Sequence, residues 1–148
     1  MALPLGAVVA RVQAMTARIC QFLIAIVFLG LGGWALFAPS SVIELALTEP
    51  YRENTFVTRF MMACFGAQAV MFGVMALVVK WGSRAFATFA VVLLPFFVFN
   101  WYFHYEVPVL TSIGMLDFAG NLTMFVACVI GWRAAKLDEQ DSQGIRSL

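Results

Sequence analysis

The sequence predicts an all-α protein: a four-transmembrane-helix antiparallel bundle with a short amphipathic surface helix between the first two spans. Composition is the first reason. Hydrophobic residues make up 63% of the chain and charged residues only 11%, whereas about a quarter of the residues of a soluble domain are charged. A soluble chain of 148 residues would leave much of that apolar surface in water. We therefore expect a single membrane domain that covers residues 1–148.

Four continuous apolar runs are the second reason. They cover residues 19–37, 60–79, 85–103 and 113–132. A helix of about 20 residues rises about 30 Å, which matches the hydrocarbon core of a bilayer. The first run follows Arg11 and Arg18 and is longer than the apolar region of a signal peptide, so we expect it to be a retained span.

The basic residues predict the orientation of the spans. Seven of the nine lie in segment 1–18, in the connection 80–84 or in the tail 133–148. The positive-inside rule then places both termini in the cytoplasm, as four spans require. Because the connection 80–84 is short, we expect the second and third spans to be antiparallel neighbours. The polar tail 133–148 is expected to fray.

The connection between the first two spans is predicted to carry the surface helix. Ser41 and Glu44 fit a capping box for a helix over 42–47. Thr55 is expected to cap the second span. Four residues of the surface helix are expected to face lipid, namely Val42, Ile43, Ala46 and Leu47.

Polar side chains converge near the outer ends of the spans. Asn100 and His104 are four residues apart in the third span, and Asp117 and Asn121 are four apart in the fourth. Residues at this spacing share a helix face, and the two spans run in opposite directions, so all four reach a similar depth. Arg59, at the outer entrance of the second span, lies at that level too.

Ionisable groups inside a membrane are costly and often functional. We therefore expect an outward-facing, ligand-binding polar pocket formed by Arg59, Asn100, His104, Asp117 and Asn121, in which Arg59 or His104 could pair with Asp117. The alternative is that these groups only satisfy one another and lock the helices together.

Gln68 is expected to contact a partner instead. On an ideal helix it lies opposite Arg59, whose face also carries Gly66 and Gly73. Small residues let helices approach closely, so the glycine face is expected to pack within the bundle. The Gln68 face is then available to a homo-oligomer or a larger membrane complex.

Several classes of site are not expected. The three cysteines, Cys20, Cys64 and Cys128, lie in apolar runs and form no CxxC pair, which argues against a redox or zinc site. We expect no cofactor and no metal. The formal charge of +1 gives no indication of a nucleic-acid partner, and no catalytic residue is assigned.

The spacing of glycines in the first two spans resembles a known family of membrane proteins. The run 30–39, Gly-Leu-Gly-Gly-Trp-Ala-Leu-Phe-Ala-Pro, is followed by Arg59 at the head of a helix that carries Gly66 and Gly73. This pattern, over about half of the chain, resembles the broad DoxX-like group of four-helix membrane proteins. The resemblance implies a four-helix membrane fold and no particular activity.

These observations predict a non-enzymatic integral membrane accessory or binding protein, whose pocket contacts a lipid, a small ligand or a partner subunit. One alternative is a small oligomeric transporter or ion-conducting protein coupled through Asp117. The other is a membrane enzyme of lipid or quinone chemistry that uses His104 and Asp117 as an acid–base pair.

Overall fold

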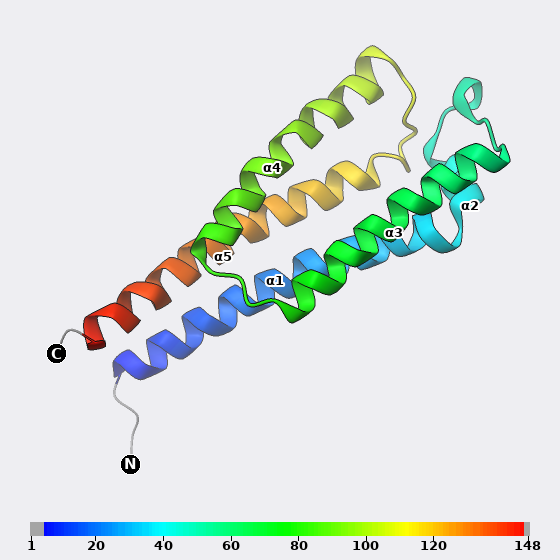
Figure 1. Ribbon diagram of the computed structural model, residues 1–148. Helices are drawn as coiled ribbons and strands as arrows, with labels where there is room; N and C mark the ends of the chain where they lie inside the picture. Colours follow the sequence, from blue (N-terminus) through cyan, green and yellow to red (C-terminus); the bar gives the residue numbers. More distant parts are fainter. Residues whose placement is uncertain (1–4, 147–148) are drawn as a thin grey trace.

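The computed structural model describes residues 5–146, with side chains for residue 6 and residues 8–141. It is an all-α bundle, as predicted (Figure 1). Four helices are long and apolar enough to cross a membrane. These helices are α1 (Leu5–Phe37), α3 (Phe56–Val78), α4 (Ser83–Trp101) and α5 (Leu116–Arg146). The short elements are α2 (Pro39–Ala46), the 3-10 helix η1 (Glu49–Tyr51) and the π-helix η2 (Tyr102–Glu106).

The terminal helices extend well beyond the apolar runs. α1 begins at Leu5 and α5 continues to Arg146, so the prediction that the tail frays after residue 132 is wrong for the part that the structure describes. Hydropathy marks the length that crosses hydrocarbon, but packing decides where a helix ends. Ala17 and Ala135 are both buried in the core cluster beyond the predicted spans. Residues 1–4 and 147–148 lie outside the described residues.

Glu139 also holds the extended part of α5 in place. Its carboxylate accepts hydrogen bonds from the backbone N–H of Ser83 at 2.9 Å and from the Ser83 hydroxyl at 2.7 Å. Ser83 is the first residue of α4, where backbone N–H groups lack a partner inside the helix. The carboxylate therefore ties α5 to the start of α4.

The four long helices are packed in a curved row. α3 packs on α1, α1 on α5, and α5 on α4, whereas α3 and α4 make almost no contact. The expectation that the second and third spans pack as neighbours is therefore wrong. Their short connection joins one end of each helix, and the two helices diverge from there (Figure 1).

The seam between α1 and α3 is closed by glycine. A Cβ atom on Gly66 would lie 2.4 Å from the backbone N of Leu36 and 2.7 Å from the carbonyl O of Gly32. A Cβ on Gly73 would lie 2.8 Å from the side chain of Leu29. Any larger residue would push the helices apart. The prediction that the glycine face packs within the bundle is confirmed.

Gln21 closes the same seam at its other end. It is 2% exposed, and its amide N–H groups donate to the backbone carbonyls of Ala76, in the last turn of α3, and of Val79, which caps that helix. Its carbonyl accepts from the backbone N–H of Trp81 at 3.3 Å. One side chain of α1 therefore holds both the end of α3 and the connection to α4.

The surface helix is present but lies differently from the prediction. α2 covers Pro39–Ala46, and Ile43 and Ala46 are buried, so the expectation that they face lipid is wrong. Ser41 forms no cap, because the helix begins two residues earlier, at Pro39, with Ala38 in the N-cap position. Its hydroxyl instead accepts a hydrogen bond from the indole N–H of Trp34 at 3.1 Å. One face of the helix therefore packs against the protein, whereas Glu44 and Leu45 are exposed.

The two outer connections are joined by backbone hydrogen bonds. The N–H of Thr48 donates to the carbonyl of Val109, and the N–H of Thr111 donates to the carbonyl of Ala46, both at 2.9 Å. Nearby, Thr55 caps the first turn of α3, as predicted. The ends of α3 and α4 that diverge are therefore linked through their loops.

Candidate functional site

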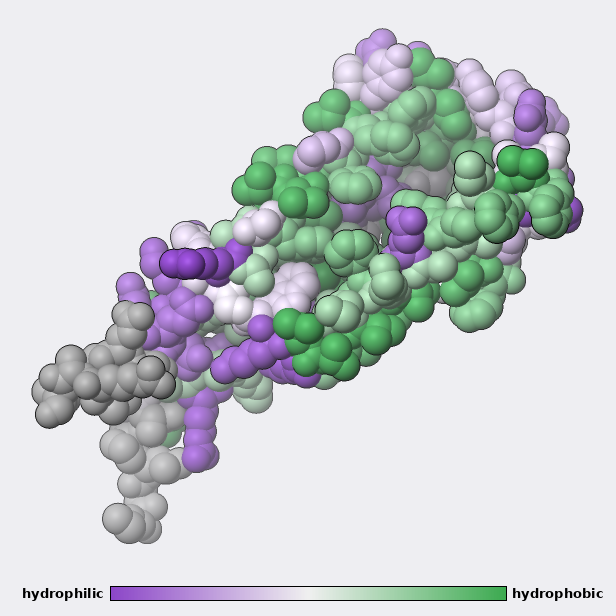
Figure 2. All heavy atoms as spheres, viewed as in Figure 1, coloured by the Kyte–Doolittle hydropathy of each residue, from purple (hydrophilic) through white to green (hydrophobic). Residues whose placement is uncertain are grey.

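A cavity of about 780 Å³ lies in the space between α3 and α4, with α1 and α5 behind it. We call it the α3–α4 groove. Its walls include Phe65 and Phe72 of α3 and Phe89 and Phe96 of α4, and its floor includes Val27 and Met124. Figure 2 shows the hollow between the two arms of the molecule. This volume is within the range of small-molecule sites, which are mostly apolar.

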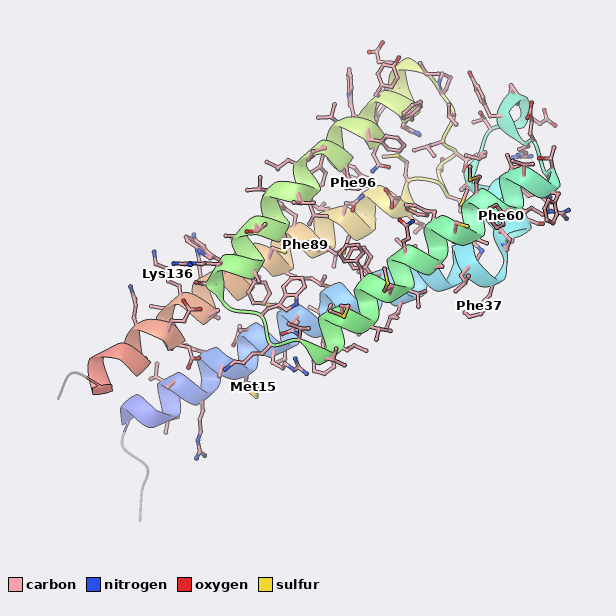
Figure 3. The ribbon with its side chains drawn as sticks, in the orientation of Figure 1. Met15, Phe37, Phe60, Phe89, Phe96 and Lys136 are labelled. Atoms are coloured by element: carbon pink, nitrogen blue, oxygen red, sulfur yellow. The ribbon has the colours of Figure 1, made fainter. Side chains whose placement is uncertain are left out.

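Aromatic side chains line the mouth of the groove. Phe65 is 58% exposed, Phe72 59% and Phe96 42%. Figure 3 shows Phe89 and Phe96 on the side of α4 that faces the gap. The mouth lies along the sides of α3 and α4 rather than at the end of the bundle. If the helices cross a bilayer, the groove opens towards lipid.

Three of the predicted site residues meet in one cluster. Oδ2 of Asp117 accepts hydrogen bonds from Nδ2 of Asn100 and from Nδ2 of Asn121, each at 2.9 Å. Asn100 is fully buried and also donates to the carbonyl of Phe96. Asp117 and Asn121 line the groove. The polar cluster Asn100–Asp117–Asn121 therefore joins α4 to α5 and presents its carboxylate to the cavity.

Some polar atoms at the groove have no partner among the described residues. Oδ1 of Asn100, which belongs to the polar cluster but not to the groove lining, is buried without a hydrogen-bond donor. Among the same residues, no hydrogen bond reaches Oδ1 of Asp117 or the amide of Gln68, which also lines the groove. Buried polar groups are usually satisfied, which makes Oδ1 of Asn100 an exception. Asp117 is half-buried and Gln68 is exposed, so their free polar atoms are open to a ligand or water.

Arg59 and His104 do not join this cluster. Arg59 is exposed in the first turn of α3, outside the lining of the groove, and makes no ion pair with any residue that the structure describes. Nδ1 of His104 lies 3.1 Å from the carbonyl O of Leu110, and its ring packs edge-on against Tyr105. In the structure, therefore, neither Arg59 nor His104 pairs with Asp117.

Gln68 lies on the open side of α3, away from Gly66. Whether it contacts a partner stays a prediction. Sequence reasoning assigned it no place in the groove, although it is three residues from Phe65 and four from Phe72, on one helix face. That shared face was the signal for a groove wall.

The described residues contain no group of three or more His, Cys, Asp or Glu side chains that could hold a metal ion. Cys20, Cys64 and Cys128 are free thiols, and Cys20 and Cys128 are buried in the core. The polar groups that the groove offers to a ligand therefore include a carboxylate and side-chain amides, set among apolar walls.

No protein-family model, curated protein or solved structure matches the chain. The resemblance to the DoxX-like group therefore stays an expectation from the sequence, and the function has to be inferred from the groove itself.

Proposed function

We propose that this protein is a non-enzymatic integral membrane binding protein that holds the apolar body of a lipid-like ligand in the α3–α4 groove. The observation that carries the proposal is the groove itself, about 780 Å³ in volume, with aromatic walls and one polar cluster at Asp117. Ligand sites typically combine apolar walls with a few convergent polar groups, which orient the ligand.

The proposal places the ligand at the lipid-facing side of the bundle. The first turn of α1 and the last turn of α5 lie at the same end of the molecule (Figure 1), and the basic residues favour the cytoplasm for that end. In this orientation the polar cluster lies in the outer half of the membrane. A lipid would enter sideways, between α3 and α4.

The contacts favour binding over acid–base catalysis. A general acid or base acts on a group within hydrogen-bond reach. His104 is engaged with the carbonyl of Leu110, and Asp117 with Asn100 and Asn121. No hydrogen bond joins these two groups among the described residues, so the contacts give no support to the enzyme that was predicted as an alternative.

The test fills the groove at one residue. Ala85 is exposed and lines the groove, whereas Ala87 is also exposed on the same helix and lies outside the lining. The full chain and its Ala85→Trp and Ala87→Trp variants are purified in mild detergent, and bound lipid is measured by native mass spectrometry. We expect the native chain and Ala87→Trp to retain lipid and Ala85→Trp to lose most of it.

Equal retention by the two tryptophan variants would contradict the proposal, and so would a native chain without bound lipid. Proton or ion flux into vesicles that depends on Asp117 would instead favour the transporter.

A further inference from the structure

The carboxylate of Asp117 at the groove has one oxygen without a hydrogen-bond donor. Oδ2 of Asp117 already accepts two amide N–H groups. In the part of the chain that the structure describes, its Oδ1 accepts none, and Asp117 lines the groove. A carboxylate oxygen can only accept hydrogen bonds. A ligand group that pairs with this oxygen must therefore carry an N–H or O–H.

Anionic head groups do not fit at this point. A phosphate or carboxylate would meet the carboxylate of Asp117, and neither Arg59 nor His104 lines the cavity to offset the repulsion. Arg84 does line it, but at the first turn of α4. Asn100 lies sixteen residues further along that helix, or about 24 Å along its axis, so Arg84 serves the opposite end of the groove.

Two uncharged or cationic head groups could donate a hydrogen bond to Asp117, a hydroxyl and an ammonium group, and the position of Gln68 favours the hydroxyl. Its side chain lines the same cavity from α3, and its amide N–H groups have no acceptor among the described residues. A hydroxyl can donate to Asp117 and also accept from an amide, whereas an ammonium group accepts nothing. An ammonium ion would also have to be desolvated between aromatic walls.

We infer that the groove selects an uncharged lipid alcohol, a long apolar body with one hydroxyl that donates to Asp117. The inference rests on the proposed function and specifies its ligand class. The groove suits such a body, because its lining on α4 runs from Arg84 to Phe96, about 18 Å along a helix axis. The walls would hold the chain, and the polar cluster would fix the end that carries the hydroxyl.

The test compares head groups on one chain. The full-length protein is reconstituted in phosphatidylcholine nanodiscs with a photoreactive long-chain alcohol, and crosslinking is competed with hexadecanol, hexadecanoate, hexadecylamine or hexadecyl methyl ether at equal mole fraction. A hydrogen bond to a charged acceptor corresponds to about a tenfold or larger change in affinity. We therefore expect hexadecanol to compete about tenfold better than the acid and the ether.

Two variants locate the effect. Asp117→Asn removes the negative charge and should bring the acid close to the alcohol. Gln68→Leu should reduce the advantage of the alcohol over the amine, and Ala87→Trp should leave all the ratios unchanged, since Ala87 lies outside the lining.

Equal competition by the alcohol and the ether, or by the alcohol and the acid, in the native chain would overturn the inference while leaving a lipid-binding groove. The strongest competition by the amine would also overturn it, in favour of a cationic lipid. If crosslinking is absent in the native chain, or is the same in Ala85→Trp, the proposed function itself fails.

Discussion

The two faces of α3 meet their surroundings in opposite ways. On one face, Gly66 and Gly73 are buried so closely against α1 that a methyl group would overlap its backbone or side chains. On the other face, Phe65 and Phe72 are more than half exposed, and Gln68 lies between them along the helix. One helix is thus sealed on one side and open on the other.

The difference shows what each face is suited to do. The sealed face needs no side chains, because helix backbones in contact gain dispersion energy at close range. The open face carries large side chains, and its amide is left without a partner by the described residues. A polar group in that position is costly in a membrane unless something satisfies it. The open face is therefore where an occupant is expected.

The largest expected effect comes from placing a methyl group in the sealed seam. In Gly66→Ala the new Cβ would lie 2.4 Å from the backbone N of Leu36, and a backbone cannot rotate away as a side chain can. Overpacking of this kind costs about 1–3 kcal/mol or more. We expect a clear drop in the thermal unfolding midpoint, measured in mild detergent.

Gly33→Ala is the matched control. Gly33 lies on α1, where an added Cβ would meet nothing within 4 Å. Alanine is favoured over glycine inside a helix by about 1 kcal/mol, so this variant should be as stable as the native chain or slightly more stable. Similar losses in both variants would mean that close approach at Gly66 does not set the stability of the seam.

A smaller effect is expected at the polar end of the same seam. Gln21→Leu leaves the carbonyls of Ala76 and Val79 without their side-chain donor. An unsatisfied buried group costs about 1–3 kcal/mol, and the added apolar contact of leucine offsets part of this loss. We expect a lower unfolding midpoint than in Gln140→Leu, a control at an exposed position of α5. Equal midpoints would show that Gln21 does not hold α3.

The smallest effect on stability is expected on the open face. Because Gln68 donates to no described residue, Gln68→Leu should change the free energy of unfolding by no more than about 0.5 kcal/mol. Native mass spectrometry of the same sample reports its oligomeric state. A loss of oligomers or of a co-purifying subunit would support the partner interface predicted from the sequence and would count against an open, ligand-facing wall.

The sequence predicted the helices and part of the cluster for identifiable reasons. Apolar length sets the spans. The four-residue spacing of Asp117 and Asn121, with Asn100 at matching depth on a helix that runs the other way, was enough to place these three together. His104 was misplaced because the chain after Trp101 forms the π-helix η2, whose wider turn breaks the periodicity that linked His104 to Asn100.

The groove could not be predicted in the same way. Depth along the membrane follows from residue number, but the direction in which a side chain points around the bundle does not. Arg59 reaches the expected end of α3 and lies outside the groove lining. The short connection between α3 and α4 suggested that the two helices touch, whereas their separation depends on how α1 and α5 pack between them.

The hydrogen bonds between the outer loops have a consequence for how the groove fills. The α1–α3 and α4–α5 arms are joined by the short connection at one end and by the Thr48 and Thr111 hydrogen bonds at the other. The groove is therefore framed at both ends, and the ligand that we propose would enter between α3 and α4 by diffusing in the plane of the membrane. Under the proposed function, occupancy would therefore follow the mole fraction of the ligand among the surrounding lipids rather than its concentration in water.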